Sequence, residues 1–271
     1  MTRQPSAGDQ AVVGLGLLAG AANVIMQLSW PGVGYGVLES KVETGNLFKH
    51  PVKRTRTTLT YLAVAFLGTP RERELYREAV NTSHLRVRSD ENSPVRYNAF
   101  DPRLQLWVAA CLYRGVHDVG EVLGPDLTEA EKERRYQEAS TLATTLQVPR
   151  SRWPRDRGAF EHYWQESLAQ VQIDDAIRRY LTDIATARFL PAPFPQLLGR
   201  LNLFVTTGFL PQRFRDEMRL PWSDRRQRRW DRLMRVLRRG VEVSPGPLRR
   251  FPYNLCLLDL RVRVRLGRPL V

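Results

Sequence analysis

The stretch VNTSHLRV contains a histidine that helical periodicity places among apolar residues. Tyr76, Val80, His84 and Val87 follow one another at steps of four, four and three residues, so they share one face of a helix with 3.6 residues per turn. The side chain of His84 is therefore predicted to point inward, and a buried imidazole needs a partner. That partner can be a backbone carbonyl or a metal ion, and in the second case His84 is the metal ligand.

An arginine on an otherwise apolar helix face is the second candidate for chemistry. In HPVKRTRTTLTYLAVAFLG, Arg54 and Thr58 lie one turn apart on a stripe that continues through Tyr61 and Ala65. A buried guanidinium needs an anion. The anion can be a carboxylate such as that of Glu39 or, in a helical pocket with one inward histidine, a haem propionate.

Signatures of the common enzyme classes are absent from the sequence, which has no glycine-rich phosphate loop, no GxSxG and no HExxH. His50, His117 and His162 are too far apart in sequence to form a local metal cluster, and we expect surface or structural roles for them. Cys111 and Cys256 form no CxxC pair, so neither a disulfide framework nor a zinc site is indicated. This cysteine usage favours a reducing, cytoplasmic compartment.

The elements that must position Arg54 and His84 are predicted to be two consecutive helices. Pro51 can open the first, because proline is tolerated in the first helical turn, and Gly68 followed by Thr-Pro ends it. The charged run RERELYREAV then begins the helix that carries His84. The composition of RSDENSPVRYNA predicts a loop after this second helix.

Clear start and stop signals mark the helices that follow. In DPRLQLWVAACLYRG, Asp101 is the predicted N-cap, Pro102 occupies the first helical position, and Gly115 is the predicted end. Thr128 and Glu131 form a capping box at the start of the next helix. Helical patterns continue to the C-terminal region, where RVRVRL alternates like a strand but has no partner strand, so we expect helix or coil there.

The uncharged segment 11–30 is long enough for a membrane span to be considered. It is rich in glycine and alanine and contains Asn23 and Gln27, which favour a buried core helix over about residues 12–28, ended by Pro31. A membrane-associated helix is the alternative. Residues 1–10 are predicted to be a flexible tail and residues 11–271 a single all-helical domain, which is enough chain for an ample core.

The net charge of +14 is concentrated toward the C-terminus, where 17 arginines and 6 acidic residues lie between Arg213 and Arg268. Such a region can bind nucleic acid, anionic lipid or an acidic partner. Apolar residues interrupt it at helical spacing, as in a solvated helix face, and no aromatic-interleaved motif indicates specific nucleic-acid binding. One functional hypothesis is therefore a non-catalytic helical module that binds an anionic partner through this arginine-rich region.

Four ordered motifs carry a family resemblance: QLSWPGVGYGVLES, HPVKRTRTTLTYL, the histidine of NTSHLRV, and YNAFDPRLQLWVAACL. Together they resemble the oxygenase family of rubber oxygenase (latex clearing protein) and fungal MpaB, formerly catalogued as a domain of unknown function. The resemblance runs from about Leu17 to Leu112 and continues more loosely into the C-terminal region. It implies an all-helical fold with a globin-like core, haem b as cofactor, and cleavage of carbon–carbon double bonds in isoprenoid chains with dioxygen.

The resemblance also implies roles for individual residues. His84 matches the histidine that ligates the haem iron, and Arg54 and Thr58 match the R-x-x-x-T pair near the haem, where they are the candidate catalytic residues. Arg54 would pair with a propionate or donate to dioxygen. On spacing alone, and not from the resemblance, Glu39 is a candidate proton acceptor. Many relatives read H-x-x-V-x-G, and this chain departs from that pattern with Ser89 in place of the glycine.

The leading functional hypothesis is therefore a haem b-dependent oxygenase that acts with dioxygen on an apolar alkene or isoprenoid-like small molecule. Its expected partners are this substrate and dioxygen, with possible peripheral membrane contact and no specific nucleic acid.

Overall fold

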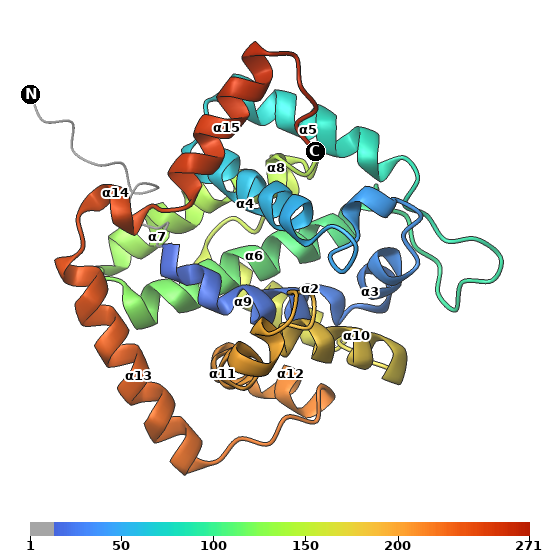
Figure 1. Ribbon diagram of the computed structural model, residues 1–271. Helices are drawn as coiled ribbons and strands as arrows, with labels where there is room; N and C mark the ends of the chain where they lie inside the picture. Colours follow the sequence, from blue (N-terminus) through green and yellow to red (C-terminus); the bar gives the residue numbers. More distant parts are fainter. Residues whose placement is uncertain (1–13) are drawn as a thin grey trace, which may run out of the picture.

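Helices account for nearly all of the regular structure in the computed structural model, which describes residues 14–271 (Figure 1). An isolated antiparallel bridge between Arg88 and Asn98 is the only extended pairing within that range. The predicted all-helical fold is confirmed, and the predicted tail lies outside the described residues. The helices are η1 (Gly14–Ala19), α2 (Gly20–Leu28), α3 (Pro31–Leu38), η2 (Glu43–Gly45), α4 (Pro51–Leu67), α5 (Pro70–His84), α6 (Pro102–Leu123), α7 (Glu129–Ala139), α8 (Thr141–Thr144), η3 (Arg150–Arg152), α9 (Arg157–Leu168), α10 (Asp175–Ala185), α11 (Phe194–Phe209), α12 (Gln212–Glu217), α13 (Asp224–Val243), α14 (Gly246–Arg249) and α15 (Tyr253–Arg265).

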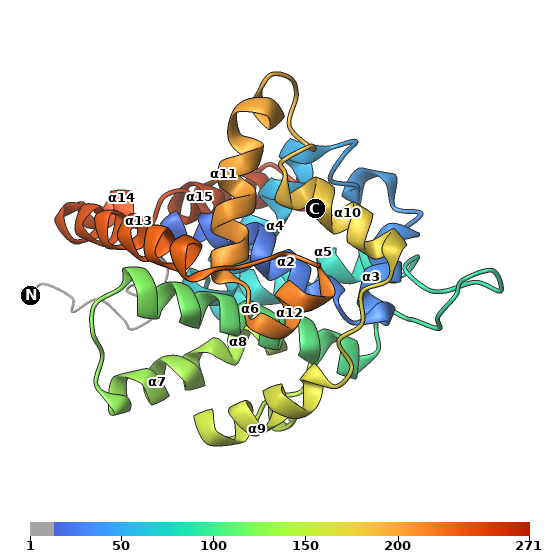
Figure 2. The ribbon, with the colours of Figure 1, turned by 90° about the horizontal axis from the view of Figure 1, so that it is seen from below.

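Helix α6 passes through the middle of the molecule, and other helices surround it (Figures 1 and 2). Asp101 caps it as predicted, accepting a hydrogen bond from the backbone N–H of Arg103. Fully buried Trp107 stacks between Trp30 and Trp164, with ring centroids 4.8 Å and 5.2 Å apart. Stacked aromatic rings of this kind contribute large buried areas to a core, so α6 is the element on which the flanking helices pack.

The predicted end of this helix at Gly115 is wrong, because α6 continues to Leu123. A β-carbon at Gly115 would lie 2.1 Å from the amide nitrogen of Asn23 on α2, which itself donates to the carbonyl of Cys111 at 2.6 Å. Glycine is therefore required here for the close approach of α2 and not as a helix stop.

Near the N-terminus the structure differs from the prediction in two respects. The chain is 3₁₀-helical over η1 before it becomes α-helical in α2, and Pro31 opens α3 where a simple break was expected. Proline suits this first helical position because its φ is already helical and its missing N–H would have no partner there. In the described part of the chain, no helix is both long and apolar enough to cross a bilayer.

Helix α15 lies along α4, although the two are far apart in sequence (Figure 1). Its buried face consists of Tyr253, Leu257 and Leu260, spaced as one helical stripe. The segment RVRVRL therefore lies at the end of a helix, in spite of its strand-like alternation. Helix was one of the two conformations expected for it, the other being coil. Packing on α4 decides the conformation, since no strand is available there to pair with it.

Candidate functional site

Arg54 and Thr58 lie on the first half of α4, where Pro51 starts the helix as predicted. The hydroxyl of Thr58 donates to the carbonyl of Arg54 at 3.0 Å, and Thr57 donates to the same oxygen at 2.9 Å. Threonine commonly bonds back to the preceding turn in this way. The proton of Thr58 is thereby used, while its oxygen can still accept a hydrogen bond.

The guanidinium of Arg54 forms no hydrogen bond or ion pair with any residue in 14–271. Its side chain is exposed to solvent, yet desolvation by the surrounding protein lowers its pKa. The guanidinium is therefore accessible to solvent although protein atoms lie around it. An arginine in this state is available to bind an anion.

A carboxylate does not supply that anion. Glu39 was the candidate partner, but its Oε2 accepts hydrogen bonds from the hydroxyls of Ser93 at 2.7 Å and Tyr97 at 2.9 Å. These bonds hold the end of α3 against the loop that precedes α6. The alternative in which Arg54 pairs with Glu39 is wrong, because no hydrogen bond or ion pair joins the two side chains and Glu39 binds the two hydroxyls instead.

His84 is the last residue of α5, and its side chain is partly buried beside Arg54. Burial and the nearby guanidinium of Arg54 lower its pKa to about 4, so the imidazole is neutral at pH 7. The ring of Phe100 meets it edge-on, with centroids 6.3 Å apart. Among residues 14–271, neither ring nitrogen has a hydrogen-bond partner, so the expected backbone-carbonyl partner is not found.

Contacts between α4 and α5 hold His84 in place relative to Arg54. The hydroxyl of Tyr76, on the buried face of α5, donates to the carbonyl of Thr57 at 2.6 Å. The Nε of Arg73 donates to the carbonyl of Val64 at 3.3 Å. Because both bonds end on main-chain carbonyls of α4, they fix how the two helices pack and not only how side chains lie.

Tyr180 on α10 is a site residue that sequence reasoning missed. Its burial raises its pKa, and the opposing effect of Arg54 shows that the two groups are close. Its ring meets Phe48 edge-on at 5.3 Å, and no described residue hydrogen-bonds its hydroxyl. No local pattern could have found it, because α10 reaches α4 only through the tertiary fold.

The remaining histidines have the surface or structural roles expected of them. His50 is exposed at the start of α4. Exposed His162 lies 3.2 Å from the carboxylate of Glu166 on the same helix. Within 14–271, no three histidine, cysteine or acidic side chains lie together in a way that could hold a metal ion.

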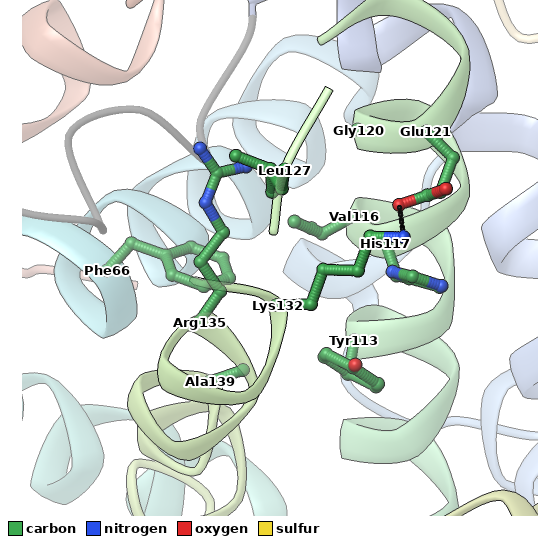
Figure 3. Close-up of a pocket in the computed structure, with 10 residues that line it drawn as sticks. All are labelled: Phe66, Tyr113, Val116, His117, Gly120, Glu121, Leu127, Lys132, Arg135 and Ala139. Atoms are coloured by element: carbon green, nitrogen blue, oxygen red, sulfur yellow. Dashed lines mark ion pairs between the residues drawn. The ribbon is translucent and has the colours of Figure 1, made fainter. Parts of the chain in front are cut away.

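His117 lines a small cavity of about 40 Å³ between α6 and α7 (Figure 3). Its ring stacks on Tyr113 at 5.8 Å, and burial lowers the pKa of His117. Lys132 points into the same cavity and pairs with Glu121 at 3.7 Å. Pockets for organic ligands are usually several hundred Å³, so this cavity suits ordered water and not a substrate.

The helical fold thus brings a neutral histidine at the end of α5 near an arginine on α4 that has no partner among residues 14–271. The catalytic domain of ER-bound oxygenase mpaB/B′ and rubber oxygenase matches residues 10–239, and the chain belongs to this oxygenase family. The family resemblance inferred from the motifs is confirmed.

Two similar proteins come from mycobacteria. An uncharacterized protein of Mycobacterium bovis and an uncharacterized protein of Mycobacterium tuberculosis are each 53% identical over 255 residues, which covers 94% of this chain and 100% of theirs. No solved structure matches the chain. Helices α14 and α15 lie beyond the matched range of the family, although α15 packs on the helix that carries Arg54.

Proposed function

We propose that the chain is a haem b-dependent oxygenase that uses dioxygen on an apolar alkene or isoprenoid-like small molecule. The observation that carries the proposal is that His84 and Arg54 lie near each other. The first offers a neutral ring nitrogen without a hydrogen-bond partner, and the second offers a guanidinium without a carboxylate. The two groups suit a cofactor that has a metal at its centre and carboxylates at its edge.

The chemistry of the two side chains fits haem in particular. A metal takes the lone pair of a neutral imidazole, and His84 offers this at pH 7 without first losing a proton. A guanidinium binds a carboxylate through two parallel hydrogen bonds, so Arg54 would hold a propionate. In the bound state, haem supplies the redox chemistry that activates dioxygen.

Thr58 and Tyr180 have complementary roles in this proposal. The hydroxyl proton of Thr58 is already donated to Arg54, so Thr58 serves as an acceptor beside the guanidinium. The phenol of Tyr180 is protonated at pH 7, and burial raises its pKa further, so Tyr180 serves as a donor. Together they would orient and hydrogen-bond polar atoms of the ligand near Arg54.

The proposal is tested by measuring dioxygen uptake. Haem-supplemented protein is mixed with squalene as an apolar alkene probe, and dioxygen consumption and carbonyl products are followed. We expect both in the wild type, and neither in His84→Ala, with His162→Ala as the matched control that retains activity. Haem binding without dioxygen uptake for squalene or a short polyisoprene would indicate a haem carrier or sensor and overturn the oxygenase proposal.

A further inference from the structure

The outward face of α13 carries a continuous row of arginines. Arg225, Arg228, Arg232, Arg235 and Arg239 follow one another at steps of three and four residues, which places them on one face of the helix. At 1.5 Å per residue this row extends for about 20 Å. The opposite face is buried and consists of Trp230, Met234 and Val241.

Helix α13 runs along the edge of the molecule (Figures 1 and 2). Because the opposite face of the helix is buried, the arginine face points toward solvent. All five arginines are exposed, and no residue in 14–271 forms an ion pair or side-chain hydrogen bond with any of them. Arg238, which lies on the flank of the helix, does find such partners, at 3.0 Å from Asp126 and 3.2 Å from Glu242. The carboxylates of this region thus sit beside the row and do not neutralise it.

Aliphatic side chains share the arginine face. Val236 is 62% exposed and Val243 is 85% exposed, and both lie among the arginines at helical spacing. Leu248 on α14, just beyond the end of α13, is 60% exposed (Figure 1). Exposed aliphatic groups gain nothing from a phosphodiester backbone in water, whereas they gain from insertion at the boundary between lipid headgroups and acyl chains. The mixture therefore favours a lipid surface over a nucleic acid.

We propose that the outward face of α13 docks on an anionic phospholipid surface, with the arginines on lipid phosphates and Val236 and Val243 at the acyl boundary. Arginine matches phosphate geometry through its fork of donors, and each basic residue near an anionic leaflet adds to the attraction. The docking is independent of haem binding. Docking would bring the oxygenase proposed above to the lipid bilayer, in which apolar alkenes dissolve.

Vesicle binding by the full chain tests the proposal, with phosphatidylcholine vesicles that contain or lack phosphatidylglycerol. We expect binding only to the anionic vesicles, weakened by added salt. The variant Arg228→Gln/Arg232→Gln/Arg239→Gln should bind about a hundredfold more weakly. The control Arg96→Gln/Arg155→Gln/Arg179→Gln removes the same charge from exposed positions outside α13 and should bind nearly as well as the wild type.

A second variant distinguishes binding to lipid from binding to nucleic acid. Val236→Ser/Val243→Ser keeps every charge, so it should weaken vesicle binding and leave binding to a DNA duplex unchanged. Three results would overturn the proposal: equal affinity for both kinds of vesicle, equal losses in the two arginine triple variants, or tighter binding to the duplex than to anionic vesicles. Circular dichroism confirms that each variant is folded, and the haem content of the variants distinguishes failure here from failure of the oxygenase proposal.

Discussion

Arg54 and Arg56 lie two residues apart on α4 and have opposite surroundings. The Nη1 of Arg56 is 3.3 Å from the carboxylate of Asp259 on α15, whereas the guanidinium of Arg54 has no partner among residues 14–271. The turn of the helix explains the difference, because it directs one side chain to α15 and the other toward His84 and Tyr180. The fold thus neutralises one cation of the pair and leaves the other for a ligand.

Replacing Arg54 by methionine should stabilise the haem-free protein and weaken haem binding. Removal of a charge without a partner relieves its desolvation cost, which solvent keeps small because Arg54 is exposed, so we expect a gain below about 1 kcal/mol in the free energy of unfolding. Loss of a charge-assisted hydrogen bond to a propionate should lower haem affinity about tenfold or more. Urea denaturation and haem titration measure the two effects.

Arg56→Met is the matched control for this experiment. It breaks an ion pair between α4 and α15, so it should lower the free energy of unfolding by up to about 1 kcal/mol and change haem affinity little. If both variants shift stability and haem affinity in the same direction, the distinction between the two arginines is refuted.

Replacing Tyr76 by phenylalanine should loosen α5 on α4. The change removes the 2.6 Å hydrogen bond to the carbonyl of Thr57, and loss of a buried bond of this kind costs about 1 kcal/mol. Because the bond lies between the helices that carry His84 and Arg54, haem affinity should fall as well. Chemical denaturation and haem titration report these losses, and an unchanged haem affinity would show that the bond does not position the site.

Two glycines on α6 should respond in opposite ways to alanine. At Gly115 the added β-carbon meets the amide of Asn23 at 2.1 Å, so Gly115→Ala should destabilise the fold by about 1–3 kcal/mol. At Gly120 nothing lies within 4 Å of the added carbon, so Gly120→Ala should stabilise it by up to about 1 kcal/mol. Thermal unfolding compares the two variants, and equal shifts would contradict the close approach of α2 to α6.

The stability of the protein should depend on pH through Asp118. Burial raises the pKa of this carboxyl from 3.8 to about 6, and this effect exceeds the opposing attraction of Arg114 at 3.1 Å. Between about pH 4 and pH 6 the folded state therefore binds more protons than the unfolded state, so this group lowers stability as pH rises. Asp118→Asn should gain stability relative to the wild type over that range. A relative loss above pH 6 would mean that the ion pair with Arg114 dominates.

Local chemistry made many helix boundaries predictable. Asp101 and Thr128 cap their helices as expected, since a cap needs only neighbouring backbone N–H groups. The role of Gly115 and the conformation of RVRVRL required tertiary knowledge, because Asn23 packs against the first and α4 packs against the second. Sequence periodicity cannot predict these contacts, because they form between residues that are far apart in the chain.

The candidate site was only partly predictable for the same reason. Periodicity and the family motifs singled out His84 and Arg54, and the structure places the two near each other. Glu39 was also considered as the partner of Arg54, but no ion pair joins the two, and Glu39 binds two hydroxyls instead. Tyr180 could not have been anticipated, because only the folded chain brings it near Arg54.

Titration of the haem-free protein with haemin, followed by absorption spectroscopy, tests the central claim most directly. The account predicts saturation at one haem per chain with a Soret band, loss of that band in His84→Ala, and its recovery when imidazole is added to the folded His84→Gly variant. Wild-type protein that binds no haemin, or a His84→Ala spectrum identical to that of the wild type, would contradict it.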